Sequence, residues 1–166
     1  MTALAAALRE ALSGRRVCVL GIGSELRRDD GAGMLLLRLL RDRAGEALLL
    51  GGATAPENFT GAVRAYGPEV LLAVDAAWMD LPPGEAALLD PEQAGGLPFS
   101  THMLPLSLTL DYLRRETGCA LILLGIQPET TEQGLGLSPA VLAGVRRLAA
   151  LLGDILEANE RTGTIG

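Results

Sequence analysis

Four ionisable side chains near the ends of apolar segments could together form a catalytic or metal-binding site. Asp29 and Asp30 follow one apolar segment, and Asp75 ends another. His102, the only histidine of the chain, precedes a segment with helical periodicity. Two carboxylates and one imidazole form a donor set of two oxygens and one nitrogen, which nickel, zinc, manganese and iron all accept. A metal-dependent site is therefore one candidate.

Each of these side chains also has a structural interpretation. Asp29 and Asp30 precede a segment with helical periodicity, where a carboxylate can cap the helix. We expect one of the pair to cap and the other to act in the site. His102 by itself could be a loop histidine with satisfied hydrogen bonds. Asp75 is harder to explain in this way, because an acid inside "LLAVDAAW" costs several kcal/mol unless it is paired or bound to a metal.

The segments that carry these residues alternate between two apolar patterns. Continuously apolar segments predict buried strands at 16–23, 46–52, 69–77, 84–90 and 119–127. Helical periodicity predicts helices over 31–45, 54–67 and 104–118, and a last helix that begins at Pro139 after a Ser138 cap. Thr54 and Glu57 have the spacing of a capping box. The alternation predicts an α/β fold, a three-layer α/β/α sandwich with a mostly parallel, twisted sheet of about five strands.

One short strand is expected to run against the others. Segment 84–90 follows the preceding strand after a Pro-Pro-Gly turn that is too short for a helical crossover, so it should be antiparallel and lie at or near an edge. In open parallel sheets, ligands bind outside the carboxyl ends of the strands. Because Asp30, Asp75, His102 and Gln127 all lie at or after strand ends, we expect them near one another at the carboxyl end of the sheet.

Length and composition limit the kind of protein. The 166 residues suggest a single domain, 1–166, in which residues 1–15 form an extra amphipathic helix packed against the sandwich. A net charge of −6 without a basic run argues against a nucleic-acid partner, and no apolar segment is long enough to span a membrane. Cys18 and Cys119 lie in strand-like segments and suggest buried thiols in a cytoplasmic protein. Nothing demands a dimer, so we expect a monomer.

Other chemistries fit the sequence less well. "GIGSEL" lacks the third glycine of a dinucleotide-binding loop, and the chain has no lysine for a phosphate-binding loop. A serine hydrolase could use Ser24 or Ser100 with His102, but the nucleophile elbow is absent and Ser100 is too close in sequence to His102. A cysteine protease would need one of the two thiols that we expect to be buried. A mechanism with two aspartates stays open.

Five segments carry a resemblance to a known family. They are "GIGSELRRDDGAG" (21–33), "GGATAPEN" (51–58), "VDAAWMDLPPGE" (74–85), "STHMLPL" (100–106) and "LGIQPE" (124–129). From about Arg16 to the last helix, the chain resembles the hydrogenase maturation endopeptidases. It is most similar to the branch that processes the large subunit of formate-hydrogenlyase-type [NiFe] hydrogenases.

The resemblance implies a peptidase that removes a short C-terminal extension from the precursor of a [NiFe]-hydrogenase large subunit after nickel insertion. It implies that Asp30, Asp75 and His102 are the catalytic and metal-recognising residues and that the nickel is carried by the substrate. Zinc or another divalent ion could replace nickel in the isolated protein.

The chain departs from the family pattern at two positions. Ser24 and Met103 stand where relatives usually carry asparagine, which removes two amides near the expected site. These departures bear on how the substrate is positioned and not on the metal-binding set. Two alternatives to the endopeptidase also stay open: a non-catalytic nickel-binding chaperone or sensor on the same fold, and a small-molecule hydrolase that uses aspartate and histidine.

Overall fold

The computed structural model describes residues 2–53, 59–90 and 103–163. Side chains are described throughout these ranges except at 52–53 and 103–107. The helices are α1 (Thr2–Leu12), α2 (Ala32–Leu40), α3 (Thr60–Tyr66), α4 (Met103–Thr117) and α5 (Pro139–Gly163), with 3₁₀ turns η1 (Arg28–Gly31) and η2 (Arg41–Arg43). The strands are β1 (Val17–Ile22), β2 (Leu48–Ala53), β3 (Val70–Ala76), β4 (Ala86–Leu89) and β5 (Ala120–Ile126).

The five strands form one sheet in the order β2-β1-β3-β5-β4. Strands β2, β1, β3 and β5 run parallel to one another. At one edge of the sheet, β4 pairs antiparallel with β5. This confirms the mostly parallel sheet and the antiparallel strand expected after the Pro-Pro-Gly turn. Every residue of β1 and β3 is buried, which agrees with their unbroken apolar sequences in the middle of the sheet.

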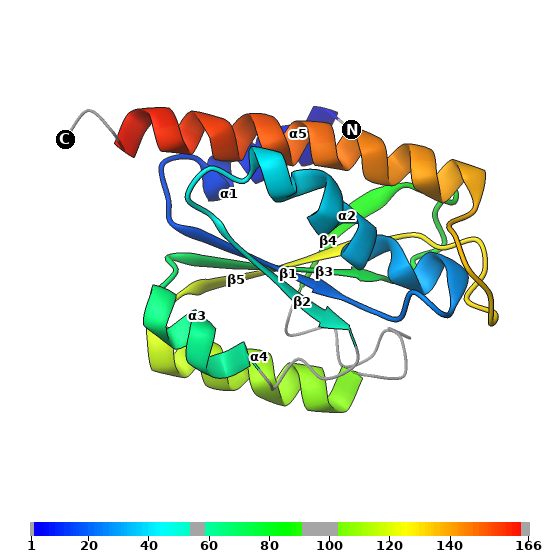
Figure 1. The fold of residues 1–166 in the computed structure, drawn as a ribbon, viewed down its shortest axis with the longest axis horizontal. Coiled ribbons are helices and arrows are strands. Elements are labelled where there is room, and N and C mark those ends of the chain that lie inside the picture. Colours follow the sequence, from blue (N-terminus) through cyan, green and yellow to red (C-terminus); the bar gives the residue numbers. More distant parts are fainter. Residues whose placement is uncertain (1, 54–58, 91–102, 164–166) are drawn as a thin grey trace.

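Helices cover both faces of the sheet, so the fold is the predicted three-layer sandwich (Figure 1). One apolar cluster joins α1, α2 and α5 to Val19, Leu72 and other strand residues. A second cluster packs residues of α3 and α4 against Leu20, Leu71 and their neighbours. Successive strand residues thus point to opposite faces, as the pleat of a strand requires.

The helix predicted over 31–45 is divided, and the helix predicted over 54–67 can be followed only from residue 59 onward. The segment predicted as a helix over 31–45 begins as the turn η1, and α2 gives way to η2 at Arg41. Gly45 then has a φ of +57°, a left-handed conformation that ends the helical segment. The helix predicted over 54–67 is observed as α3, and the proposed capping box of Thr54 and Glu57 lies outside the described residues.

The N-terminal helix α1 packs against the sandwich, as expected. Leu8 and Leu12 are fully buried in the same cluster as α5. Asn159 of α5 accepts a hydrogen bond from the Gly14 amide at 2.7 Å and donates one to the Leu12 carbonyl at 2.9 Å. These contacts cap the end of α1 and join it to α5.

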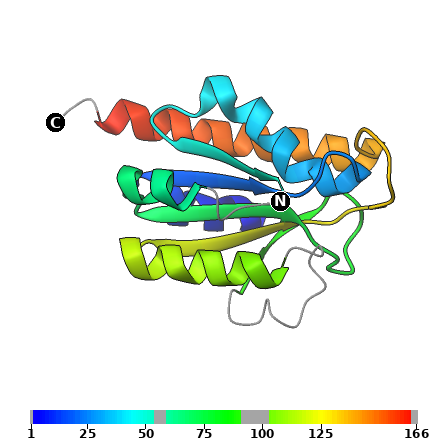
Figure 2. The same ribbon diagram turned by 60° about the horizontal axis from the view of Figure 1, so that its bottom comes forward.

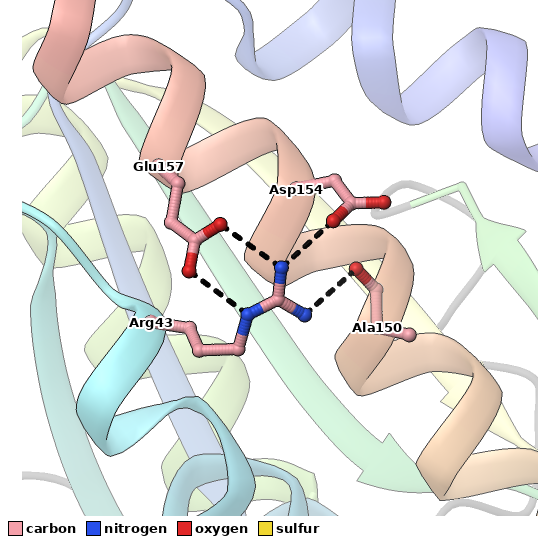
Figure 3. A network of polar contacts seen from close by, with 4 residues as sticks. All are labelled: Arg43, Ala150, Asp154 and Glu157. Carbon is pink, nitrogen blue, oxygen red and sulfur yellow. Dashed lines mark hydrogen bonds and ion pairs between the residues drawn. The ribbon is translucent and has the colours of Figure 1, made fainter.

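An arginine joins η2 to α5 on the same face of the sheet (Figure 3). The Arg43 guanidinium donates to both carboxylate oxygens of Glu157, at 2.9 and 3.0 Å, and to Asp154 at 2.7 Å. The two bonds to Glu157 form the bidentate geometry that makes an arginine pair specific.

Among the described helices, none is both long enough and apolar enough to cross a membrane.

Candidate functional site

Two buried carboxylates lie at the carboxyl ends of the neighbouring parallel strands β1 and β3. Asp75 is the second-last residue of β3, and Asp30 belongs to η1, which follows β1 and contacts β3. Gly21 of β1 pairs with Val74, so the two strands end at nearly the same level. Asp30 is fully buried and Asp75 is 3% exposed. The structure therefore places these two predicted residues at the same end of the sheet, where the parallel strands have their carboxyl ends.

Two glycines allow η1 to approach the strand ends this closely. Gly23 has a φ of +119°, and a Cβ there would lie 1.9 Å from the Asp30 carbonyl oxygen. Gly33, in the first turn of α2, leaves no room for a side chain either, since a Cβ would lie 2.5 Å from the Val74 carbonyl oxygen. The "GIG…GAG" pattern thus brings the start of α2 onto β1 and β3, close to Asp75.

The Asp30 carboxylate has one oxygen in use and one without a partner. Its Oδ2 accepts a hydrogen bond from the Ser24 amide at 2.8 Å. Its Oδ1 is buried and has no hydrogen-bond partner among the described residues. A buried acceptor without a partner costs about 1–3 kcal/mol, and in a native site it calls for a ligand or a functional explanation. A cation or a substrate donor would satisfy this oxygen.

The contacts of Ser24 are local. Its amide holds Asp30, and its hydroxyl accepts a hydrogen bond from the Leu26 amide at 3.3 Å. The serine side chain therefore shapes the turn between β1 and η1.

Asp75 is held inside the sheet. Its Oδ1 accepts a hydrogen bond from the Ala76 amide at 2.8 Å, and its backbone pairs with Gly125 of β5.

His102, the third predicted member of the site, lies outside the described residues, directly before the first residue of α4. Within the described part of the chain, no three His, Cys, Asp or Glu side chains gather as a metal site. A site with three such ligands would need a residue such as His102.

The comparisons with known proteins agree on the family. A family model described as HycI, hydrogenase maturation protease, matches residues 36–155, well over half of the chain. The chain belongs to the hydrogenase maturation protease family. The hydrogenase 3 maturation protease of Escherichia coli K12 is 38% identical to it over 113 residues, which are 67% of this chain and 72% of that protein.

Solved structures of family members share the fold of this maturation protease. A crystal structure of a [NiFe] hydrogenase maturation protease HycI from Thermococcus kodakarensis KOD1 is 32% identical, with a TM-score of 0.82 over 91% of this chain and 99% of that one. The solution structure of an endopeptidase HycI from Escherichia coli is 33% identical, with a TM-score of 0.74 over 83% and 90%. Because its relatives are named proteases and endopeptidases, the protein is an enzyme of the peptidase class, and the non-catalytic alternative loses support.

Asp29 does not cap the helix that follows it, and the prediction that one of the two adjacent aspartates would do so was wrong. Neither η1 nor α2 has a hydrogen bond from a capping side chain within the described residues. The Asp29 carboxylate instead accepts bonds from Glu129, Thr130 and Ser138, across the loop that precedes α5. The sequence could not show this, because the partners lie about a hundred residues away.

Two further polar residues organise the loops around the strand ends. The Gln127 Oε1 accepts hydrogen bonds from the amides of Met79 and Leu81, at 2.7 and 3.3 Å, and the residue is buried. Gln127 therefore holds the loop after β3, a structural role that its position at the end of β5 did not reveal. Ser138 precedes α5 as predicted, but its hydroxyl donates to Asp29.

Neither cysteine of this protease is placed as a nucleophile. Cys18 and Cys119 are both buried and unpaired. Burial, with a smaller contribution from Cys119, raises the pKa of the Cys18 thiol to about 12, so that thiol stays protonated near neutral pH. Their burial confirms the expectation of buried thiols and argues against either one as the attacking group.

A cavity of about 310 Å³ lies at the opposite end of the sheet, where β1 begins. Arg16, Tyr66, Glu69 and Asn159 are among its lining residues. The Arg16 amide and side chain are already bound to Glu69 and to the Gly67 carbonyl. The cavity is therefore separate from the carboxylates at the carboxyl ends of the strands.

Proposed function

We propose that this protease removes the C-terminal extension from the nickel-loaded precursor of a [NiFe]-hydrogenase large subunit. We further propose that Asp30, Asp75 and His102 recognise nickel carried by that precursor. The family membership supports the reaction class, and the names of the relatives connect the family to hydrogenase maturation. The single observation that carries the metal-recognition part is the buried Asp30 Oδ1, which has no partner among the described residues.

The proposed roles follow from the positions of the two carboxylates. Asp30 offers an oxygen that no described group uses, and the Ser24 amide holds the other oxygen in place. Asp75 supplies a second carboxylate on the adjacent strand. Because water is largely excluded from both, their attraction to a cation is much stronger than it would be in solvent. An imidazole from His102 would complete a donor set that suits nickel.

This arrangement would couple cleavage to nickel loading. A precursor that carries nickel on its own thiolates could gain bonds to the enzyme's carboxylates, while a precursor without nickel could not. The empty precursor would therefore bind more weakly and be cut slowly. Nickel placed there could also polarise the scissile carbonyl.

The test uses the precursor of the hydrogenase large subunit, prepared with and without nickel. Each form is incubated with the wild type and with Asp30→Asn, Asp75→Asn and His102→Ala, and the precursor mass is followed over time. We expect the wild type to remove a C-terminal peptide from the nickel-loaded form only. Each substitution should slow this cleavage by at least about 100-fold, the typical loss when a group that stabilises the reacting centre is removed.

Asp42→Asn is the matched control, because Asp42 is an exposed aspartate of η2, away from the carboxyl ends of β1 and β3. Its cleavage rate should equal that of the wild type. Equal cleavage of nickel-free and nickel-loaded precursor would contradict nickel recognition. An intact precursor after incubation with wild-type enzyme, despite confirmed nickel, would contradict the proposed substrate.

A further inference from the structure

Asp29 has a buried carboxylate next to Asp30 that the proposed recognition of the substrate does not use. It is fully buried, and it accepts four hydrogen bonds from the loop between β5 and α5. The Glu129 and Thr130 amides donate to Oδ2 at 2.9 and 3.0 Å, and the Ser138 hydroxyl donates to the same atom at 2.8 Å. The Ser138 amide donates to Oδ1 at 2.7 Å. One side chain thus holds both ends of the 129–138 loop.

Backbone hydrogen bonds extend this contact between the two loops. The Arg28 amide donates to the Gly134 carbonyl at 3.0 Å, and the Gly134 amide donates to the Leu26 carbonyl at 2.9 Å. The Asp29 amide donates to the Thr130 carbonyl at 3.2 Å. Figure 1 and Figure 2 both show the chain that leads into α5 beside the start of α2. The 129–138 loop therefore supports η1 along its length.

Asp30 depends on this support because little else orients its carboxylate. Among the described residues, the Ser24 amide is the only hydrogen-bond donor to its side chain. Asp30 and Asp29 belong to the same four-residue turn, in which the Asp30 amide donates to the Arg27 carbonyl at 3.1 Å. A shift of η1 would therefore move the Asp30 carboxylate relative to β3 and Asp75.

We propose that Asp29 is a positioning residue of this protease: by binding the 129–138 loop, it holds η1 so that the Asp30 carboxylate keeps its direction beside β3. Asp29 itself touches neither substrate nor metal. The effect on cleavage rests on the proposed function, whereas the effect on the direction of Asp30 does not. A misplacement of about 1 Å at a reacting group can cost about 100-fold in rate, so small movements of η1 matter.

The test compares two substitutions of graded severity. Ser138→Ala removes one of the four hydrogen bonds and leaves the Ser138 amide in place. Asp29→Asn keeps the shape of the side chain but turns an accepting oxygen into an amide that faces donors. Arg43→Gln is the control, because it removes the ion pairs between η2 and α5 at the other end of α2. Each variant is measured at the same number of degrees below its own melting temperature.

The first measurement is hydrogen exchange of the Ser24 amide by NMR, because this amide reports the bond to Asp30 Oδ2. It needs no precursor. We expect exchange at Ser24, relative to amides inside β3, to rise by at least about tenfold in Asp29→Asn and by less in Ser138→Ala. Arg43→Gln should leave this ratio unchanged. A ratio in Asp29→Asn that equals the wild-type ratio would overturn the proposal.

The second measurement is kcat/KM for cleavage of the nickel-loaded precursor. It should fall by about tenfold or more in Asp29→Asn, fall less in Ser138→Ala and stay at the wild-type value in Arg43→Gln. Losses of equal size in Asp29→Asn and Arg43→Gln would show that Asp29 contributes only stability, which overturns the proposal. If wild-type enzyme does not cut the precursor, the proposed function fails, and the Ser24 exchange ratio still decides whether Asp29 positions Asp30.

Discussion

At the residue scale, Asp29 and Asp30 show how two identical neighbours acquire different roles. Both are fully buried in the same turn. Asp29 has four hydrogen bonds from a distant loop, whereas Asp30 has one from the described residues and keeps one oxygen unused. A carboxylate with its acceptors satisfied stabilises structure, and one with an unused buried oxygen is suited to bind a ligand. The difference lies in the surroundings, not in the residue type.

Gly23→Ala tests how closely the turn must approach Asp30. The new Cβ would lie 1.9 Å from the Asp30 carbonyl oxygen, and the φ of +119° is unfavourable for alanine. We expect a loss of about 2 kcal/mol or more in the free energy of unfolding, because strain and the clash add. Cleavage of the precursor should be abolished, since Asp30 must move. Urea denaturation and a precursor cleavage assay measure the two effects.

Gly14→Ala is the matched control for this substitution. Gly14 also has a positive φ, of +72°, but a Cβ there would meet no heavy atom within 4 Å. We expect a loss of about 1 kcal/mol from the backbone conformation alone, with unchanged cleavage. If both variants lost the same stability and kept full activity, the close contact at Gly23 would have no functional importance.

At the scale of elements, the attachment of α2 and η2 to α5 is partly electrostatic. Arg43 of η2 binds Glu157 and Asp154 of α5 at a half-buried position (Figure 3). The hydrogen bonds from Arg43 lower the pKa of the Glu157 carboxyl below its ordinary value of 4.5. This contact is separate from the apolar cluster that holds the same elements.

The lowered pKa of Glu157 predicts a pH dependence of stability. A carboxyl with a lower pKa in the folded state stabilises the fold fully above its ordinary value, and loses this effect as the pH falls through the lowered pKa. We therefore expect Glu157→Gln to lower the urea midpoint at pH 7, and the difference from wild type to shrink as the pH falls below about 4.5. Glu116→Gln, at an exposed position on α4, should show no such difference. A difference that stays constant down to pH 3 would contradict the ion pair.

At the scale of the whole molecule, the described core consists of apolar side chains. Two apolar clusters hold the helices on the two faces of the sheet. The two described carboxylates of the site lie at the strand ends, outside these clusters. Binding of a metal by the free enzyme would therefore add to stability only in proportion to its affinity.

We expect the purified protein to retain little metal and to keep its stability when a chelator is added. If the precursor carries the nickel, as we propose, the enzyme needs no resident ion, and Asp30, Asp75 and His102 should release a divalent ion when the precursor is absent. Elemental analysis should find clearly less than one nickel or zinc per chain, and EDTA should leave the melting temperature unchanged. One tightly held ion per chain, with a lower melting temperature after EDTA, would contradict nickel carried by the substrate.

Much of the architecture could be predicted from the sequence because its signals are local. The unbroken apolar segments around Cys18 and Leu72 indicated buried parallel strands, and the Pro-Pro-Gly turn indicated the antiparallel edge strand β4. The position of Asp75 at the end of such a strand made it a candidate site residue, and the structure shows it buried near the carboxyl end of β3. These inferences depend on periodicity and on turn chemistry, which neighbouring residues determine.

Contacts between distant segments could be decided only by the tertiary structure. The sequence by itself determined the sheet, the helical layers and the pair of carboxylates at the strand ends, because each depends on residues close together in the chain. The residue patterns left open which of Asp29 and Asp30 acts in the site, and only the family resemblance pointed to Asp30. The structure shows that Glu129, Thr130 and Ser138, about a hundred residues away in the sequence, donate hydrogen bonds to Asp29. Among the described residues, the Asp29 carboxylate has its hydrogen bonds satisfied, whereas Asp30 Oδ1 has no partner and is available for a ligand.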